Sequence, residues 1–304
     1  MRVLVTGGAG FLGRALCAEL AAEGHEVVAL DNMSSASPLP LPSKVLLVRG
    51  DVITPLAVEG PFERVFHLAS PASPLRYLLD PVGTLRTGAE GTRNVLEAAE
   101  RWGARFIYTS TSEVYGDPER NPQSEDYAGS VQVTADRACY DEAKRYGEAL
   151  IYAFGRSGRN VETRVARLFN TYGPGMHPGD GRVVSNFVVQ ALRGAPLTIF
   201  GDGSQTRSFC YVDDMLDGLR RLADSDYPGP LNLGNPTETT IAELANVVSE
   251  MIGDTGRITK PLPEADPKRR QPDISRARSL LGWEPSTDLH TGLTSTIDYF
   301  RSHA

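Results

Sequence analysis

The chain has 304 residues, 40% of them hydrophobic and 23% charged, a composition typical of a globular protein with one large or two modest domains. Its formal net charge is -7 and its basic residues are dispersed, which argues against a nucleic-acid partner. Three separated cysteines (Cys17, Cys139 and Cys210) argue against a disulfide framework, and no apolar stretch approaches the roughly 18 residues of a membrane span, so we expect a soluble, cytoplasmic protein with no membrane partner.

Short β-branched runs alternate with helical patterns through the first half of the chain. The patterns predict strands over 2–5, 26–30, 45–48, 64–68, 105–109 and 162–169, and helices over 11–23, 84–102 and 135–154. The strands are almost continuously apolar, as expected for strands buried on both faces of a parallel sheet. This rhythm predicts an α/β fold with a Rossmann-type doubly wound parallel sheet.

The texture of the sequence changes after Asn170, where turn-forming residues cluster over 172–175 and 178–181. We place the boundary of a smaller C-terminal substrate-binding lobe here, with residues 1–171 forming the dinucleotide-binding domain and residues 172–304 mainly the lobe. Strand-like segments over 209–212 and 231–233 are candidates to return to the first domain. Amphipathic helices are expected over 241–252 and 289–300, and a Ser- and Pro-rich surface loop over 34–42.

A glycine loop follows the first predicted strand. Gly7, Gly10 and Gly13 stand where a Rossmann fold needs a tight turn, close approach to a pyrophosphate and close packing of helix on sheet. Asp31 ends the next strand, where a carboxylate accepts hydrogen bonds from the adenosine ribose and repels a 2'-phosphate. A structural glycine turn and a capping aspartate are the alternative readings. The combination favours NAD as the cofactor.

Tyr140 and Lys144 are spaced i, i+4, so on a helix they share one face. A neighbouring ammonium and a positive nicotinamide would favour the tyrosine phenolate, which makes the pair a usable acid and base. The same spacing also occurs on ordinary amphipathic helices. Polar residues of the segment 108–116 follow a strand and are expected at the carboxyl edge of the sheet, where hydroxyls can join the relay.

This order of motifs resembles the extended short-chain dehydrogenase/reductase family of nucleotide-sugar enzymes. Within that family, four segments are similar to the members that decarboxylate UDP-glucuronate: 67–74, 137–142, 180–187 and 269–274. Related dehydratases carry Asp-Glu where this chain has Ser112-Glu113, which argues against dehydration. The resemblance implies NAD-dependent decarboxylation of UDP-glucuronate to UDP-xylose through a 4-keto intermediate, with NAD regenerated in each turnover, and a homodimer joined through helices near 84–102 and 135–154.

The resemblance also implies roles for individual residues. Thr111 would be the hydroxyl partner of Tyr140, while Glu113 and Arg270 would orient the sugar and manage water or a proton at C5. Arginines supply planar donors suited to the diphosphate, and Tyr77 would reach the glucuronate unless it only packs. The expected cofactor site comprises Gly7, Gly10, Phe11, Leu12, Gly13, Asp31, Asn32, Asp51, Val52, Leu68, Ala69, Tyr140 and Lys144; the expected substrate site comprises Ser70, Tyr77, Ser112, Asn170, Arg182, Val183, Arg207 and Arg270.

Several positions depart from the family pattern. Gly175 and Gly88 replace a usual Arg and Asn, and the loop after Asp31 lacks the usual cationic residues. The alternatives are therefore a UDP-sugar 4-epimerase, an enzyme that releases the 4-keto pentose, and a non-catalytic NAD-binding protein. His67 lies on an apolar strand and is expected to be a core residue, and no histidine spacing suits a metal, so no metal is predicted.

Overall fold

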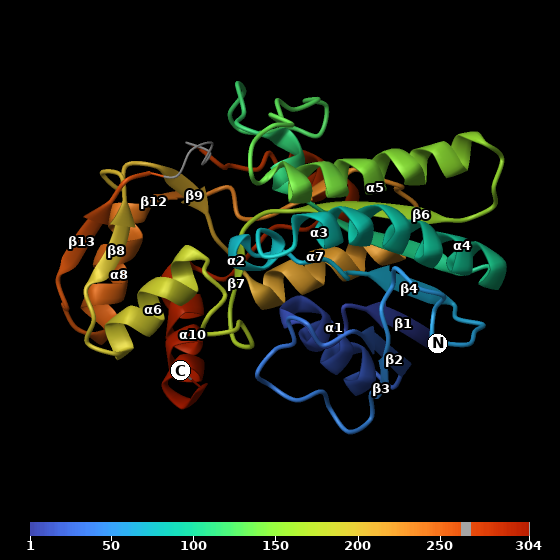
Figure 1. The fold of residues 1–304 in the computed structure, drawn as a ribbon, viewed down its shortest axis with the longest axis horizontal. Helices are drawn as coiled ribbons and strands as arrows, with labels where there is room; N and C mark the ends of the chain where they lie inside the picture. Colours follow the sequence, from blue (N-terminus) through green and yellow to red (C-terminus); the bar gives the residue numbers. More distant parts are fainter. Residues whose placement is uncertain (263–268, 304) are drawn as a thin grey trace.

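A seven-stranded parallel sheet forms the centre of the protein in the computed structural model, which describes residues 1–262 and 269–303 (Figure 1). The strand order is β11-β6-β5-β4-β1-β2-β3, and every pairing is parallel. This confirms the predicted doubly wound α/β fold. In chain order the strands are β1 (Arg2–Thr6), β2 (Glu26–Asp31), β3 (Leu46–Arg49), β4 (Arg64–His67), β5 (Arg105–Thr111), β6 (Thr163–Leu168) and β11 (Leu231–Leu233).

Helices cover both faces of this sheet. On one face α1 (Phe11–Ala22), α7 (Val212–Asp224) and α9 (Ser275–Leu281) bury their apolar stripes, and on the other α4 (Thr92–Trp102) and α5 (Ala138–Arg156) do so. Successive residues of β1 point to opposite faces, so Val3 and Val5 join the first core while Leu4 joins the second. Most of the apolar runs seen in the sequence are therefore strands covered on both sides, whereas the edge strand β3 is partly exposed.

The C-terminal region builds a separate core around α6 (Val183–Leu192), α8 (Ile241–Ile252) and α10 (Leu289–His303). Two small sheets accompany these helices: β8 (Leu197–Phe200) with β13 (Arg257–Lys260), and β9 (Thr206–Ser208) with β12 (Glu238–Thr240). Thr240 begins α8 with a reciprocal capping box to Glu243. The expected helices over 241–252 and 289–300 are confirmed.

Three elements differ from the expectations. The helix expected over 84–102 is divided into α3 (Pro81–Arg86), a π-helical turn η1 (Thr87–Gly91) and α4, and the helix expected from 135 begins at Ala138. The 231–233 segment does return to the main sheet, beside β6. The 209–212 segment does not: β10 (Cys210–Tyr211) pairs with β7 (Thr171–Tyr172) in a separate small sheet, and α7 begins at Val212.

The π-helical turn packs unusually close to α5. A Cβ atom added at Gly88 would lie 2.4 Å from the Cβ of Ala143, a separation that van der Waals repulsion forbids. Glycine at this position therefore lets the turn contact the helix that carries Tyr140 and Lys144.

Candidate functional site

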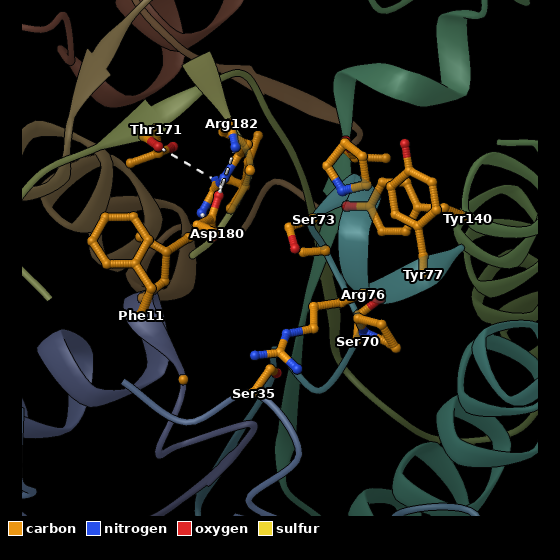
Figure 2. A pocket seen from close by; sticks show the side chains of 18 of the residues that line it. Phe11, Ser35, Ser70, Ser73, Arg76, Tyr77, Tyr140, Thr171, Asp180 and Arg182 are labelled. Carbon is orange, nitrogen blue, oxygen red and sulfur yellow. Dashed lines mark hydrogen bonds and ion pairs between the residues drawn. The ribbon is translucent and has the colours of Figure 1, made fainter. Parts of the chain in front are cut away.

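One cleft of about 660 Å³ runs along the carboxyl ends of the main strands and continues toward α6 and β9. The glycine loop forms one end, and the two tyrosines at positions 77 and 140 lie across from Phe11 and Arg182 (Figure 2). Every residue predicted for the site lines this cleft: Gly7, Gly10, Phe11, Leu12, Gly13, Asp31, Asn32, Asp51, Val52, Leu68, Ala69, Ser70, Tyr77, Thr111, Ser112, Glu113, Tyr140, Lys144, Asn170, Arg182, Val183, Arg207 and Arg270.

The glycine loop fits a dinucleotide phosphate because its backbone leaves no room for side chains. A Cβ atom at Gly13 would lie 2.0 Å from the carbonyl oxygen of Gly7, so the first turn of α1 approaches the loop directly. The backbone N–H groups of that turn are the ones a helix leaves without internal partners. The residues present therefore suit the pyrophosphate of NAD.

Asp31 connects this loop to the end of β2. Its carboxylate accepts hydrogen bonds from the backbone N–H groups of Ala9, at 2.9 Å, and Met33, at 2.7 Å. Asn32 donates to the Asp51 carboxylate at 2.8 Å, which extends the acidic, hydrogen-bonding wall expected around an adenosine ribose. Asp31 thus caps the turn and also lines the cleft, so the two readings of this residue are compatible.

The loop after β2 bridges the two sides of the cleft. The Ser37 N–H donates to the Ala9 carbonyl at 2.7 Å, and the Ser37 hydroxyl donates to the Gly175 carbonyl at 2.8 Å. Gly175, which departs from the family pattern, is therefore held against the loop that lacks the usual cationic residues.

Tyr140 lies buried against Tyr77, with ring centroids 5.1 Å apart and planes inclined by 8°. Burial raises the pKa of Tyr140 to about 12, while a hydrogen bond with Thr111 opposes that rise. We expected the Lys144 ammonium and a bound nicotinamide together to favour the phenolate; among the groups of the protein itself, burial has the largest effect on this pKa and raises it. The predicted pairing of Thr111 with Tyr140 is present as a hydrogen bond.

Lys144 points along the same helix face and donates to the Thr109 carbonyl at 2.8 Å. Its ammonium lies 5.1 Å from the centroid of the Tyr108 ring. Burial lowers the pKa of Lys144 to about 7, and the Glu148 carboxylate partly opposes this shift. The lysine can therefore change protonation state near neutral pH.

Glu113 is the centre of a buried ion cluster. Its carboxylate contacts the guanidinium of Arg270, Nη2 to Oε2 at 2.8 Å, and also that of Arg137. Burial by itself would raise the pKa of Glu113, but the two arginines outweigh it and lower the pKa to about 2. The Glu113 carboxylate is consequently ionised at neutral pH.

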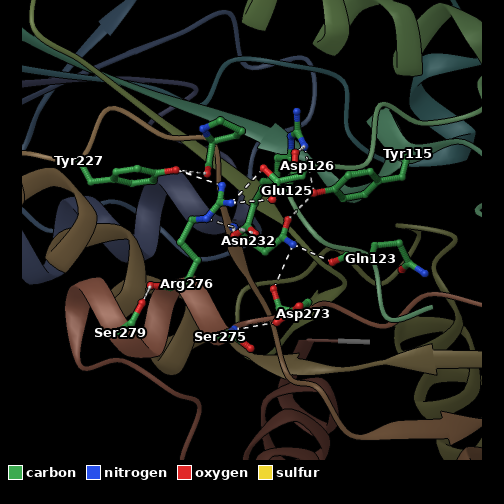
Figure 3. Close-up of polar contacts among 12 residues, drawn as sticks. Tyr115, Gln123, Glu125, Asp126, Tyr227, Asn232, Asp273, Ser275, Arg276 and Ser279 are labelled. Carbon is green, nitrogen blue, oxygen red and sulfur yellow. Dashed lines mark hydrogen bonds and ion pairs between the residues drawn. The ribbon is translucent and has the colours of Figure 1, made fainter. Parts of the chain in front are cut away.

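Arg270 is held in place by segments distant in sequence. It is 2% exposed, and its backbone carbonyl accepts a hydrogen bond from the Ser208 hydroxyl at 2.8 Å. The next residue, Gln271, exchanges hydrogen bonds with Gln123, both at 2.8 Å. A polar network anchors the loop around Gln123 to the sheet, since the Asn232 amide of β11 donates to the Gln123 carbonyl at 2.9 Å (Figure 3).

The predicted diphosphate anchors are partly engaged within the protein. Arg182 forms a bidentate ion pair with Asp180 and lies 5.7 Å from the centroid of the Phe11 ring (Figure 2). Arg207 donates to the Thr206 carbonyl at 2.8 Å and also lines the cleft. Their positive charge faces the cleft, but that of Arg182 is balanced by a neighbouring carboxylate.

Two arginines that line the cleft were not among the predicted site residues. Arg76 of α2 (Pro74–Tyr77) extends toward Ser35, and no motif identified it (Figure 2). Arg137 belonged to a segment used only for family resemblance, although its position three residues before Tyr140 places it on the same side of a helix. His67, by contrast, is the expected core histidine: it is 1% exposed and hydrogen-bonded to Thr6 and Thr92.

Two features are absent from the part of the chain that the structure describes. Within 1–262 and 269–303, no group of three or more His, Cys, Asp or Glu residues is arranged to hold a metal ion. No helix in that part of the chain combines the length and apolar character required to cross a membrane.

Residues 3–234 match the model of the NAD dependent epimerase/dehydratase family, and the chain belongs to this family. UDP-glucuronic acid decarboxylase 1 of Xenopus tropicalis is 49% identical over 99% of this chain and 72% of its own length. UDP-glucuronic acid decarboxylase 6 of Arabidopsis thaliana is 49% identical over 99% of this chain and 89% of its own length.

Solved structures agree with the fold. A UDP-glucose 4-epimerase with UDP-glucose from Thermotoga maritima superimposes with a TM-score of 0.93 and 31% identity, covering 99% of both chains. A UDP-glucuronic acid 4-epimerase from Bacillus cereus, in complex with UDP-glucuronic acid and NAD, gives a TM-score of 0.87 and 27% identity, also over 99% of both chains.

Proposed function

We propose that this protein decarboxylates UDP-glucuronate to UDP-xylose and uses an NAD that it regenerates in each turnover. The observation that carries the proposal is the ionised Glu113, clamped by Arg270 and Arg137, in the same cleft as the buried Tyr140 and Lys144. The extensive identity to proteins named UDP-glucuronic acid decarboxylases supports it. We further propose that residues 1–171 mainly hold NAD and that residues 172–304 mainly hold the UDP-sugar.

The first chemical role belongs to Tyr140, which accepts the proton of the sugar C4 hydroxyl and has Thr111 as its hydrogen-bond partner. When bound, NAD would supply the acceptor for the C4 hydride and the donor that returns it, and its positive ring would oppose the high phenol pKa. Lys144 lies on the same helix face, and its pKa, lowered to about 7, lets it take up or release a proton near neutral pH. Glycine-loop N–H groups and the Asp31 carboxylate hold the cofactor's phosphates and ribose.

Oxidation at C4 creates a ketone β to the C6 carboxylate. Carbon dioxide then leaves with its bonding electrons retained by the sugar as an enolate, and a proton added at C5 completes the decarboxylation. Glu113 is ionised and carries no proton to donate, because its pKa is held to about 2. We therefore assign Glu113 and Arg270 to orienting the sugar and the water that supplies the C5 proton.

The test is incubation of the protein with UDP-glucuronate and NAD, followed by mass spectrometry of the nucleotide sugar and measurement of released CO2. Equal amounts of CO2 and UDP-pentose, with no lasting absorbance of NADH, are expected. A product of unchanged mass with inverted C4 would establish a 4-epimerase instead. Accumulation of NADH with a 4-keto pentose would establish early release, and no turnover would favour a non-catalytic NAD-binding role.

The epimerase alternative has a specific observation in its favour, since the structural neighbours named as 4-epimerases share this fold over nearly the whole chain. Both reactions begin with proton removal at C4. They diverge at the C6 carboxylate, so the fate of that group decides between them.

We also propose that the protein is a homodimer. Leu79, Val82 and Leu85 are 78%, 66% and 42% exposed. They are spaced three residues apart, with Leu79 just before α3 and the other two within it, so they lie on one side. Tyr146 of α5, the helix packed against α3, is 45% exposed. An apolar patch of this kind is typical of a protein interface. Light scattering should give twice the chain mass, and Val82→Glu should give the monomer mass.

A cytoplasmic location remains part of the proposal. It is supported by the three cysteines, which are all free and buried.

A further inference from the structure

Three segments bring two arginines and two acids together: the start of α5, with Arg137 and Asp141, the turn after β5, with Glu113, and the segment before α9, with Arg270. Arg137 immediately precedes α5 and Asp141 lies in the first turn of that helix, with Nε and Oδ2 separated by 3.3 Å, and Arg137 also pairs with Glu113. Asp141 is 3% exposed, and its Oδ1 has no hydrogen-bond partner within the described part of the chain. Arg137, Glu113 and Arg270 line the cleft, whereas Asp141 does not.

The charge of this cluster suits an incoming anion. Arg137 and Arg270 carry two positive charges against the single negative charge of Glu113. Burial, reinforced by the neighbouring Glu113, raises the pKa of Asp141 to about 7, so this second acid carries only part of a negative charge near neutrality. The cluster therefore presents an excess of positive charge to the cleft.

The position of Arg137 relative to Tyr140 matches the chemistry of a hexuronate. The carboxylate of the sugar is attached at C5, the carbon next to C4, so a sugar whose C4 hydroxyl meets Tyr140 carries its anion close to that contact. Arg137 precedes the first residue of α5 with a helical backbone conformation, so it lies on the same side as Tyr140, three residues later. A guanidinium has five N–H donors and suits bidentate recognition of carboxylates even when protein acids already orient it.

We propose that Arg137 binds the C6 carboxylate of the UDP-sugar and that Asp141 is a positioning residue that holds the Arg137 guanidinium at the wall of the cleft. This inference deepens the proposed function and rests on it for the identity of the ligand. It assigns recognition of the acidic sugar to the first turn of α5, separately from the diphosphate anchors.

The experiment compares two ligands that differ by the carboxylate, UDP-glucuronate and UDP-xylose. Calorimetric titration of NAD-saturated protein is done in a Tyr140→Phe background, so that the ligand is not consumed. Arg137→Gln should raise the Kd of UDP-glucuronate roughly 10- to 100-fold, the value of a charge-assisted contact, and change that of UDP-xylose less than about twofold. Arg156→Gln, at an exposed position in the last turn of α5, is the control and should change neither.

Asp141→Asn tests the positioning role. It should raise the Kd of UDP-glucuronate by roughly 3- to 10-fold and leave the Kd of UDP-xylose unchanged. General destabilisation of the fold would affect both ligands alike and would not change the ratio of the two Kd values. Equal losses for both ligands, or no loss, would overturn the role of the residue concerned. If Arg137→Gln does not fold, Arg137→Lys permits the same comparison, because it keeps the charge and loses the planar fork.

Failure of the proposed function is distinguishable from failure of this inference. A selective loss of UDP-glucuronate affinity, together with no CO2 release by the wild-type protein, would remove decarboxylation and leave the carboxylate site. Release of CO2 by the wild-type protein, together with equal losses of affinity for both ligands, would support decarboxylation and reject the carboxylate site.

Discussion

Replacing Arg270 with Met should destabilise the fold much more than the same change at Arg269. Arg270 is 2% exposed and donates to both Glu113 oxygens, at 3.3 and 2.8 Å, and to the Gly116 carbonyl. The Arg270→Met protein would leave the buried Glu113 carboxylate with only one of its two arginines. Removing one partner of a buried ion pair costs about 3–5 kcal/mol, and we expect a loss near the lower end because Arg137 remains.

The neighbouring arginine provides the control. The Arg269 side chain is 55% exposed and pairs with Glu238 at 2.7 Å, an arrangement worth about 0–1 kcal/mol. Urea unfolding at neutral pH, with equal m-values, gives both free energies. A double-mutant cycle with Glu113→Gln should show coupling, because without the carboxylate there is no charge to strand. A loss below about 1 kcal/mol for Arg270→Met would refute the view that this ion pair is strongly coupled to folding.

Three further predictions follow from the site. Tyr140→Phe should lower kcat by roughly 100- to 10,000-fold, measured as CO2 release, while UDP affinity by calorimetry stays within about twofold; unchanged turnover would contradict the proton-transfer role. Gly13→Ala should weaken NADH binding at least about tenfold in fluorescence titrations, because the added Cβ would lie 2.0 Å from the Gly7 carbonyl oxygen. Gly155→Ala is the control and should bind NADH normally, because its Cβ would meet nothing within 4 Å. The folded-state pKa of Lys144 is about 7, against an ordinary value of 10.5, so between these pH values the unfolded chain holds a proton that the folded protein has lost. In NAD-free protein, the free energy of unfolding of the wild type, measured relative to Lys144→Met, should therefore rise by up to about 5 kcal/mol as the pH increases across this range. Parallel pH profiles for the two proteins would contradict this prediction.

The sequence was informative wherever a local pattern specified a local structure. The apolar strands, the glycine loop and the i, i+4 spacing of Tyr140 and Lys144 depend on residues close in the chain, and each lies where the pattern placed it. Patterns failed where packing decided the outcome. The 209–212 run has strand character, but pairing with β7 and the start of α7 limit it to two residues outside the main sheet.

The electrostatics of the site also required the tertiary structure. From the sequence, a lysine near a tyrosine suggested a lowered phenol pKa, but burial dominates and raises the pKa of Tyr140 to about 12. The extent of burial is set by segments such as α2, whose Tyr77 stacks on Tyr140 from 63 positions earlier in the chain.

The sequence by itself determined the sheet, the cofactor loop and the identity of the acid–base pair, because strand and helix periodicity and glycine spacing act over a few residues. Only the tertiary structure decided that Glu113 and Arg270, which are 157 residues apart, form one buried cluster with Arg137 and Asp141. Long-range contacts of this kind arise when the chain returns to the same sheet edge, and no spacing in the sequence encodes the distance or the charge balance that results.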